Sequence, residues 1–348
     1  DKKDFIYFRT LHSLAFKQLG LTKDDVMKDN HYKELSDLLG IKLSNTNRKM
    51  DSTGFQLQDD VFAKVIDMAR VRNVTLKEQF HEMSHMEGGW LKIKYIADGI
   101  KEYKKSRKLY DFTDMIIEFS KSTNDEIIPK LDVLIVDEAQ DLSKLQWECI
   151  KKLATNVKHV HIAGDDDQAI YQWAGADVNT FVELEGDVTV LEQSYRIPKK
   201  VHEIAQGILN RIPEQNRREK FWHPRDVDGN VFVYTSHEHL DYSEGEWLVL
   251  ARNGYLLNKV EKFLQQIGFI YARNNVLSVK QELLDAIGNW ELLRKNRKVA
   301  ATKIRDIYFF MSVGKSVARG HKKLPGVGED DLLDLEELKE NHGLLTDA

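Results

Sequence analysis

Two apolar runs that end in carboxylates constrain the fold of this chain most. The stretch LDVLIVDE covers 131–138, and HVHIAGDD at 159–166 repeats its form. Continuous apolar runs of this length are typical of strands buried in a parallel sheet. Helical patterns at 144–154 and 178–184 intervene, and DVTVLEQ at 187–193 predicts another strand. Strands that alternate with helices in this way predict an α/β fold with a doubly wound parallel sheet.

The segments on either side of this region predict further helices and strands. FIYFRT at 5–10 alternates as a strand does, and a helix is expected from His12. Residues 14–108 are expected to be mostly helical, with a one-sided apolar stripe at 61–71. Downstream, the patterns predict helices near 199–211 and 255–267, strands at 230–236 and 246–253, and a helical, basic segment from about 276.

Composition narrows the class of protein. The 348 residues are enough for two or three domains, and 42% of them are hydrophobic. No run of 18 apolar residues and no signal-peptide pattern occurs, so no membrane contact is expected. The single cysteine, Cys149, fits the reducing cytoplasm of a bacterial or phage-infected cell. A net charge of −5 means that nucleic-acid binding would need local basic patches.

The first acidic pair, Asp137 and Glu138, lies just beyond a predicted buried strand. In nucleotide-hydrolysing α/β proteins this position suits one acid that holds Mg²⁺ and a second that orients or deprotonates the attacking water. The alternative is a solvated strand end without chemistry. The pair alone does not decide between them.

The stretch GDDDQAIYQWAGAD at 164–177 combines three consecutive aspartates with an amide and two aromatic rings. Its Gln168 can donate and accept hydrogen bonds, which suits contact with a γ-phosphate. Tyr171 and Trp173 offer faces on which single-stranded bases stack, worth ~1–3 kcal/mol per base. One loop would then touch phosphate at one end and nucleic acid at the other. The alternative places both rings in the hydrophobic core.

LEQSYRIP at 191–198 adds two further candidates. Arg196 would serve as an arginine finger that stabilises charge on the transferring phosphoryl group. Tyr195 beside it would stack on a purine. An exposed surface arginine without function is the alternative for Arg196.

Five segments in this order resemble the UvrD/Rep/PcrA family of superfamily 1 DNA helicases, namely TLHS (10–13), YDFTDMI (110–116), VDEAQD (136–141), GDDDQAIYQWAGAD (164–177) and LEQSYR (191–196). The similarity continues through KFWHPRDVDGNV and 246–271. It implies a P-loop NTPase fold with RecA-like doubly wound sheets and helical insertions. It also implies Mg-ATP hydrolysis coupled to movement on single-stranded DNA, with 3′–5′ polarity and action at duplex junctions.

The resemblance assigns roles by position. Asp137 would bind Mg²⁺, Glu138 would be the catalytic base, and Gln168 and Arg196 would contact the γ-phosphate. Tyr195 would stack on adenine, with Gln140 also in the nucleotide site. Thr10 and His12 would lie along the DNA backbone, and Tyr171 and Trp173 along the bases.

The resemblance also implies a domain plan. Residues 1–13 and 109–195 would form part of the first motor domain, and 14–108 its helical insertion. Residues 196–275 would begin the second motor domain, and 276–348 its insertion.

Two departures qualify the match. Ala174 stands where the family often has arginine. A contact between the aromatic pair, Tyr171 and Trp173, and the nucleotide phosphates is therefore in doubt. The phosphate-cradling pattern G-x-x-x-x-G-K-[ST] occurs nowhere, since Gly314-Lys315-Ser316 has Phe309 at the required first glycine. The expectation is therefore an internal helicase fragment that hydrolyses ATP negligibly by itself.

Two other classes stay open. A Gly-Asp-Asp hairpin with Asp137 nearby would suit a template-dependent polymerase with two metals. A DNA-binding module without catalysis would keep the aromatic contacts and basic patches, of which the sequence offers two: 92–108, and Arg294, Lys295, Arg297, Lys298, Lys303 and Arg305.

Overall fold

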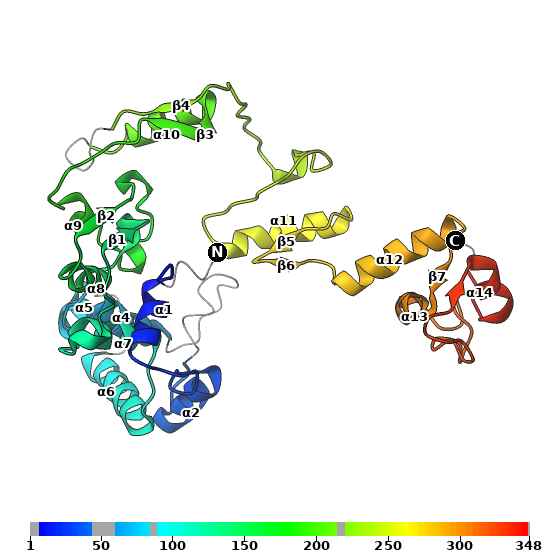
Figure 1. Ribbon diagram of the computed structural model, residues 1–348, viewed down its shortest axis with the longest axis horizontal. Coiled ribbons are helices and arrows are strands. Elements are labelled where there is room, and N and C mark those ends of the chain that lie inside the picture. The colour runs from blue at the N-terminus through cyan, green and yellow to red at the C-terminus, as the bar shows by residue number, and fades with distance from the viewer. Residues whose placement is uncertain (1–6, 44–59, 84–88, 214–219, 347–348) are drawn as a thin grey trace. The chain divides into compact units, whose positions relative to one another are not determined.

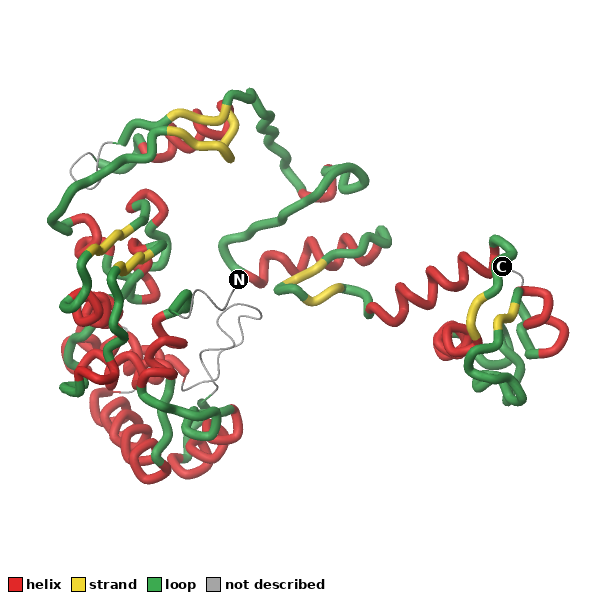
Figure 2. Tube along the Cα trace, in the orientation of Figure 1, coloured by secondary structure: helices red, strands yellow, loops and turns green. Residues whose placement is uncertain are grey.

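The computed structural model describes residues 7–43, 60–83, 89–213 and 220–346. The chain divides into two compact units, Asp1–Val233 and Tyr234–Ala348, and each is described by itself. Figure 1 follows the order of the elements, and Figure 2 separates helices, strands and loops.

The first unit contains the βαβ arrangement that the two apolar runs predict. Strands β1 (Val133–Val136) and β2 (His159–Ile162) pair in parallel, and α8 (Lys144–Ala154) connects them. The sheet buries Leu134 and Val136 on one face only, while Ile135 on the other face is 72% exposed. The mixed α/β class is confirmed. The described residues contain only two-stranded sheets, so the doubly wound arrangement stays a prediction.

The covered face of β1 and β2 packs on helices that begin at strong caps. Thr10 caps α1 (Leu11–Gln18), Asp111 caps α7 (Phe112–Lys121), and Ser143 forms a capping box with Gln146 at α8. The buried side chains of these helices form one core with the sheet, and it includes Leu14, Met115, Phe119, Trp147 and Ile150. Burial of each large side chain contributes roughly 1.5–3 kcal/mol.

The described residues within 14–108 are mostly helical, as predicted. They form the end of α1, then α2 (Asp29–Leu39), α4 (Asp60–Val71), α5 (Leu76–Glu82) and α6 (Gly89–Arg107). The apolar stripe of α4 buries Phe62, Val65, Ile66 and Ala69. Its hydrophobic spacing of three and four residues therefore identified the core face correctly.

A partly buried ion cluster fastens α4 and α6 to the cap of α7. The Arg70 guanidinium lies 2.8 Å from Asp111 Oδ1 and 2.5 Å from Asp114 Oδ1. The Lys104 ammonium lies 2.6 Å from both carboxylates. Burial works against ionisation of Asp111, but Arg70 and Lys104 outweigh it and hold the pKa of Asp111 well below its usual range. The YDFTDMI segment is thus the anchor of the helical region.

A second parallel pair follows later in the first unit. Strands β3 (Gln193–Pro198) and β4 (His223–Arg225) flank α10 (Lys199–Leu209). Shorter elements complete the unit: η1 (Asp125–Ile127), η2 (Ala139–Asp141), η3 (Asp166–Gln168), η4 (Gln172–Ala174) and α9 (Val178–Val182).

Four predicted strands differ from the structure. Residues 7–10 form a turn and a helix cap, and residues 5 and 6 lie outside the described ranges. Of 187–193 only Gln193 enters a strand, and 230–236 and 246–253 join no ladder. Val233 is 96% exposed and Leu248 is 82% exposed. Apolar alternation marks a segment able to pair, but a strand forms only where a partner supplies the hydrogen bonds.

The second unit begins with η6 (His237–His239) and the predicted amphipathic helix, α11 (Gly254–Gln266). A hairpin follows, with β5 (Ala272–Arg273) and β6 (Val276–Leu277) antiparallel. Its turn residues Asn274 and Asn275 both have positive φ, 51° and 63°, which asparagine tolerates well.

The rest of the second unit, described to residue 346, contains three helices and has its own core, but 311–334 forms turns and a short strand instead of the helix that the prediction from 276 implied. It consists of α12 (Gln281–Arg294), β7 (Val299–Ala300), α13 (Ala301–Phe310), β8 (Leu332–Leu333) and α14 (Leu335–Asn341). Leu293, Ile304, Tyr308 and Leu338 fill the centre. Among the described helices, none has the length and apolar character to cross a membrane.

Candidate nucleotide and nucleic-acid site

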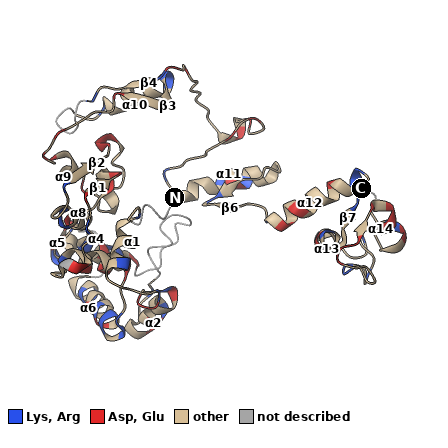
Figure 3. Cartoon of the chain, viewed as in Figure 1, with Lys and Arg blue, Asp and Glu red and all other residues tan. Residues whose placement is uncertain are grey.

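The two acidic strand ends lie next to each other, as the sequence predicts. Beyond the last paired residues, Val136 and Ile162, the Ala163 amide donates to the Val136 carbonyl at 2.8 Å. The Ala139 amide then donates to the Ala163 carbonyl at 3.0 Å. The carboxyl ends of parallel strands meet at one edge, where α/β proteins bind ligands. Acids beside β2 stand out in Figure 3.

Glu138 has an unusual backbone conformation for a residue with a side chain. Its φ of 51° and ψ of 42° are left-handed, which costs a non-glycine residue about 1–3 kcal/mol. The Glu138 amide donates to Asp137 Oδ1 at 3.0 Å, and both carboxylates are exposed. The strain therefore falls on the residue that the sequence nominates as catalytic base.

Gln140 connects the two strand ends through its side-chain amide. It is 1% exposed, donates through Nε2 to Glu138 Oε2 at 2.8 Å, and accepts the Asp165 amide at Oε1 at 3.1 Å. A Cβ at Gly164 would lie 2.7 Å from Gln140 Oε1. Glycine at this position is therefore what admits the bridging side chain.

Lys220 partly neutralises the negative charge of the three consecutive aspartates. Its ammonium lies 2.5 Å from Asp165 Oδ1, 2.5 Å from Asp166 Oδ1 and 3.0 Å from Asp167 Oδ2. Burial works to raise the pKa of Asp165, but hydrogen bonds from Lys220 and Gln168 leave it below its ordinary value. Burial lowers the pKa of Lys220, and the three aspartates more than reverse this. Sequence analysis gave Lys220 no role, although it begins the KFWHPRDVDGNV segment.

Gln168 is exposed, and its side chain donates through Nε2 to Asp165 Oδ2 at 2.7 Å. Gly164–Asp166 does not form a hairpin, because it follows a strand that pairs in parallel and leads into η3. That geometry contradicts the polymerase alternative, which needs Gly-Asp-Asp at a hairpin turn.

The aromatic end of the same loop faces solvent. Tyr171 is 46% exposed and Trp173 is 57% exposed, with ring centroids 6.4 Å apart. These exposures contradict the core alternative for both rings. Gly175 has φ of 99°, and a Cβ there would lie 2.8 Å from Val71 Cγ2, so glycine permits close packing on α4.

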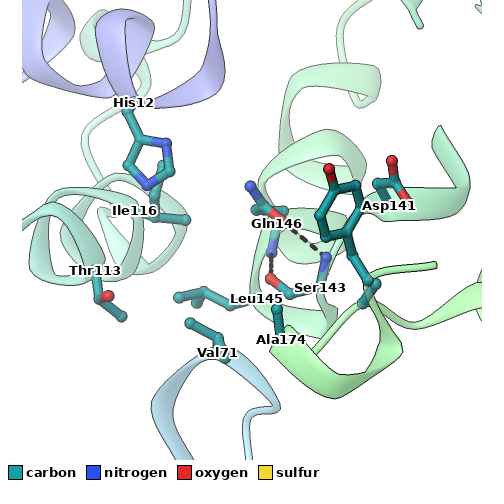
Figure 4. A pocket seen from close by; sticks show the side chains of 11 residues that line it. His12, Val71, Thr113, Ile116, Asp141, Ser143, Leu145, Gln146 and Ala174 are labelled. Atoms are coloured by element: carbon teal, nitrogen blue, oxygen red, sulfur yellow. Dashed lines mark hydrogen bonds between the residues drawn. The ribbon is translucent and has the colours of Figure 1, made fainter. Parts of the chain in front are cut away.

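A cleft of about 190 Å³ brings Tyr171 together with His12. Figure 4 shows His12 of α1, Thr113 of α7 and Asp141 of η2 around this cleft. The His12 ring meets the Phe112 ring edge-on at 5.9 Å, and burial lowers the pKa of His12. Ala174 also lines the cleft.

Asp141 is another polar side chain of the same cleft. Its Oδ1 is buried without a hydrogen-bond partner among the described residues. Burial first, and then the charge of Glu138, raises the pKa of Asp141. The cleft therefore combines aromatic and polar walls close to the first acidic strand end.

A second cleft, of about 500 Å³, lies beside Trp173 and has basic walls. The Lys64 ammonium is 5.6 Å from the centroid of the Trp173 ring, within range of a cation–π interaction. Arg72 and Lys144 also line this cleft, and Arg72 forms an ion pair with Glu82. Sequence analysis missed Lys64 and Lys144, because single lysines on helices are usually only solvated.

Three sequence-predicted residues lie outside this constellation. Thr10 caps α1 by accepting the Ser13 amide at 3.3 Å. Tyr195 and Arg196 lie on β3, and Tyr195 is 81% exposed. Among the described residues, no ion pair joins the Arg196 guanidinium to the strand-end acids.

Residues 3–189 match the model of the UvrD/REP helicase N-terminal domain. The chain is 25% identical over 327 residues to the ATP-dependent DNA helicase PcrA of Bacillus subtilis, covering 88% of this chain and 43% of that protein. It is 29% identical to the ATP-dependent DNA helicase Rep of Buchnera aphidicola, covering 47% of this chain and 28% of the relative. The chain thus spans less than half the length of these relatives.

Proposed function

Because the chain belongs to the UvrD/REP helicase family, we propose that it is the part of an ATP-dependent DNA helicase that couples Mg-ATP hydrolysis to 3′–5′ movement on single-stranded DNA. One observation carries the proposal. Residues 164–177 connect the joined acidic strand ends to two exposed aromatic rings. A movement at the phosphate end of this loop would reach Tyr171 and Trp173, and the bases stacked on them, through a few residues of backbone.

The acids next to β1 suit a magnesium nucleotide. Asp137 offers an exposed carboxylate, a hard oxygen ligand that Mg²⁺ prefers. No group of three or more potential metal ligands occurs among the described residues. Mg²⁺ in nucleotide sites is generally held by one or two carboxylates plus substrate phosphates and water. Asp137 would hold the ion, which supplies charge neutralisation at the phosphates.

Glu138 would accept the proton of the attacking water, and Gln140 would support the site by fixing the Glu138 carboxylate. Gln168 and Arg196 would contact the γ-phosphate, and Tyr195 would stack on adenine. The exposure of Gln168, Tyr195 and Arg196 leaves these side chains accessible to a nucleotide.

The DNA strand would run past the two clefts. Tyr171 and Trp173 would stack on bases, and Thr10 and His12 would lie along the backbone. Lys64, Arg72 and Lys144 would attract phosphates beside Trp173. Duplex junctions are the expected substrate of the whole helicase.

The domain plan belongs to the same proposal. Residues 1–13 and 109–195 would contribute to a RecA-like motor with a doubly wound sheet, and 14–108 would be its insertion. Residues 196–275 would begin the second motor domain and 276–348 its insertion. The uncovered face of β1 and β2 leaves room for the second layer of helices that a doubly wound sheet carries.

Binding of an oligothymidylate to the 348-residue chain tests the DNA contact. Trp173→Ala should weaken binding roughly 5- to 150-fold, the loss expected when one stacked base loses its partner. Trp247→Ala is the matched control, since Trp247 in the second unit is 48% exposed. Equal affinities for wild type and Trp173→Ala would overturn the DNA-binding proposal.

A DNA-binding module without catalysis is the second candidate, favoured by the lack of G-x-x-x-x-G-K-[ST] in these 348 residues. Most of the grip on β- and γ-phosphates comes from that loop. Under either candidate, this chain by itself should release negligible phosphate from Mg-ATP. Measurable, DNA-stimulated phosphate release would contradict that expectation. Recovery of turnover when a P-loop segment is supplied would favour the helicase over the module.

A further inference from the structure

Lys220 differs in its surroundings from Lys199, the lysine that pairs with an acid just after β4. Lys220 reaches three consecutive carboxylates from more than 50 positions away, and its side chain is only 19% exposed. Lys199 pairs with Asp226 at 2.5 Å, but those side chains are 45% and 95% exposed. An exposed ion pair contributes about 0–1 kcal/mol to stability, so the Lys199 pair does not fix its neighbours in one arrangement.

The contact of Lys220 continues to Gln168 through one carboxylate. Asp165 Oδ1 accepts from Lys220 Nζ, and Asp165 Oδ2 accepts from Gln168 Nε2 at 2.7 Å. The ammonium therefore fixes the carboxylate that orients the Gln168 amide. Without the ammonium, Asp165 would be repelled by Asp166 and Asp167 and would lose its fixed geometry.

The same aspartate also connects to the first acidic pair. The Asp165 amide donates to Gln140, whose other end donates to Glu138. Lys220, Asp165, Gln140 and Glu138 thus form one continuous polar chain with Gln168 as a branch. Gln140 is the buried link of this chain at 1% exposed, and its two side-chain hydrogen bonds hold the strand ends in one arrangement.

We propose that Lys220 is a positioning residue, which orients Gln168 through Asp165 and ties the segment before β4 to the nucleotide site. The inference rests on the proposed function, in which Gln168 contacts the γ-phosphate. If a γ-phosphate draws the Gln168 amide away from Asp165, Asp165 loses one of its hydrogen bonds. The contact between Asp165 and Lys220 then changes as well. The nucleotide state is thereby communicated to residues 220–225.

The test observes the Gln168 side-chain amide by nuclear magnetic resonance in the ¹⁵N-labelled 348-residue chain. Gln168→Leu identifies the resonances by their disappearance. Lys220→Met should move them toward free-amide shifts and speed their exchange with water about two- to tenfold, the loss of one hydrogen bond. Lys220→Arg should restore the wild-type signature, and Lys199→Met should leave it unchanged.

An unchanged Gln168 signature in folded Lys220→Met would overturn the proposal, as would an equal change in Lys199→Met. If Lys220→Met does not fold, Lys220→Met/Asp167→Asn removes one charge of each sign and must give the same Gln168 change. The readout needs neither nucleotide nor DNA. A lost Gln168 signature together with unimpaired oligothymidylate binding by Trp173→Ala would therefore retain this inference and reject the DNA proposal.

Discussion

Two acidic clusters in the first unit have different charge balances. Around the cap of α7, three aspartates, Asp67, Asp111 and Asp114, meet two cations, Arg70 and Lys104. The strand ends carry five carboxylates, namely Asp137, Glu138 and the three at 165–167. Among the described residues, Lys220 is the basic side chain that forms ion pairs with them, and it contacts 165–167 only. Acids that are balanced within the fold hold helices together, whereas acids in excess are available to a cation from outside. Asp111 and Asp114 of the first cluster, and the acids of the second, belong to segments that carried the family resemblance.

The largest expected effect concerns the balanced cluster. Asp111→Asn keeps a capping side chain but removes the charge between Arg70 and Lys104. The free energy of unfolding of the first unit should fall by about 3 kcal/mol, the low end for breaking a buried pair, because some exposure remains. Urea denaturation measures it. The control Asp132→Asn breaks the exposed pair with Lys158 and should cost under about 1 kcal/mol. Equal losses of unfolding free energy in Asp111→Asn and Asp132→Asn would contradict the distinction between the two kinds of ion pair.

The pH dependence of the same variant sharpens the comparison. The pKa of Asp111 is depressed in the folded state, so its stabilisation is complete above the unfolded value of about 3.9 and disappears as the pH falls through the folded value. The difference between wild type and Asp111→Asn should stay constant from neutral pH to about pH 5 and shrink only below about pH 4. Urea denaturation across this range checks it. A difference that shrinks near neutral pH would contradict the assignment to Asp111.

Gly164→Ala tests the bridge at the strand ends. The new Cβ would lie 2.7 Å from Gln140 Oε1 and 3.2 Å from the Ala139 amide nitrogen, so Gln140 must move at a cost of about 1–3 kcal/mol. The variant should lose stability, and the Asp165 amide should exchange faster. Gly207→Ala on α10 is the control, since nothing lies within 4 Å of a Cβ there. Wild-type exchange at Asp165 in Gly164→Ala would show that Gln140 does not need the glycine.

The smallest effect is expected at Lys64. Replacing it by alanine should reduce the slope of log affinity for oligothymidylate against log salt by about 0.7, one phosphate contact on a single strand. Fluorescence anisotropy at several salt concentrations measures this slope. Lys158→Ala, an exposed lysine paired away from the clefts, should leave the slope unchanged. An unaltered slope in Lys64→Ala would remove Lys64 from the DNA path.

Local patterns predicted the elements around the site well. The runs ending at Glu138 and Asp166 gave β1 and β2, and their adjacency followed from the parallel connection through α8. Apolar alternation predicted strands at 187–193, 230–236 and 246–253, and apart from Gln193 in β3 these segments form none. Pairing depends on partners that no local pattern contains.

The candidate site was predictable only in part. Tyr171 and Trp173 are exposed, which favours the hypothesis that they stack on bases and contradicts the alternative that they belong to the core. Lys220 was not predictable, because more than 50 residues separate it from Asp165 and no spacing rule relates them. Gln140 was nominated for the nucleotide site, but its bridge to Asp165 depends on Gly164 in three dimensions.

The central claim is that residues 164–177 connect a nucleotide end to a single-strand end. Hydrogen–deuterium exchange of the 348-residue chain, with and without an oligothymidylate, tests it most directly. The account predicts slower exchange in 168–176 and in the segments that hold His12 and Lys64, with the exposed aromatic residues around Phe309 unaffected. Protection confined to other segments, or no protection at saturating oligothymidylate, would contradict it.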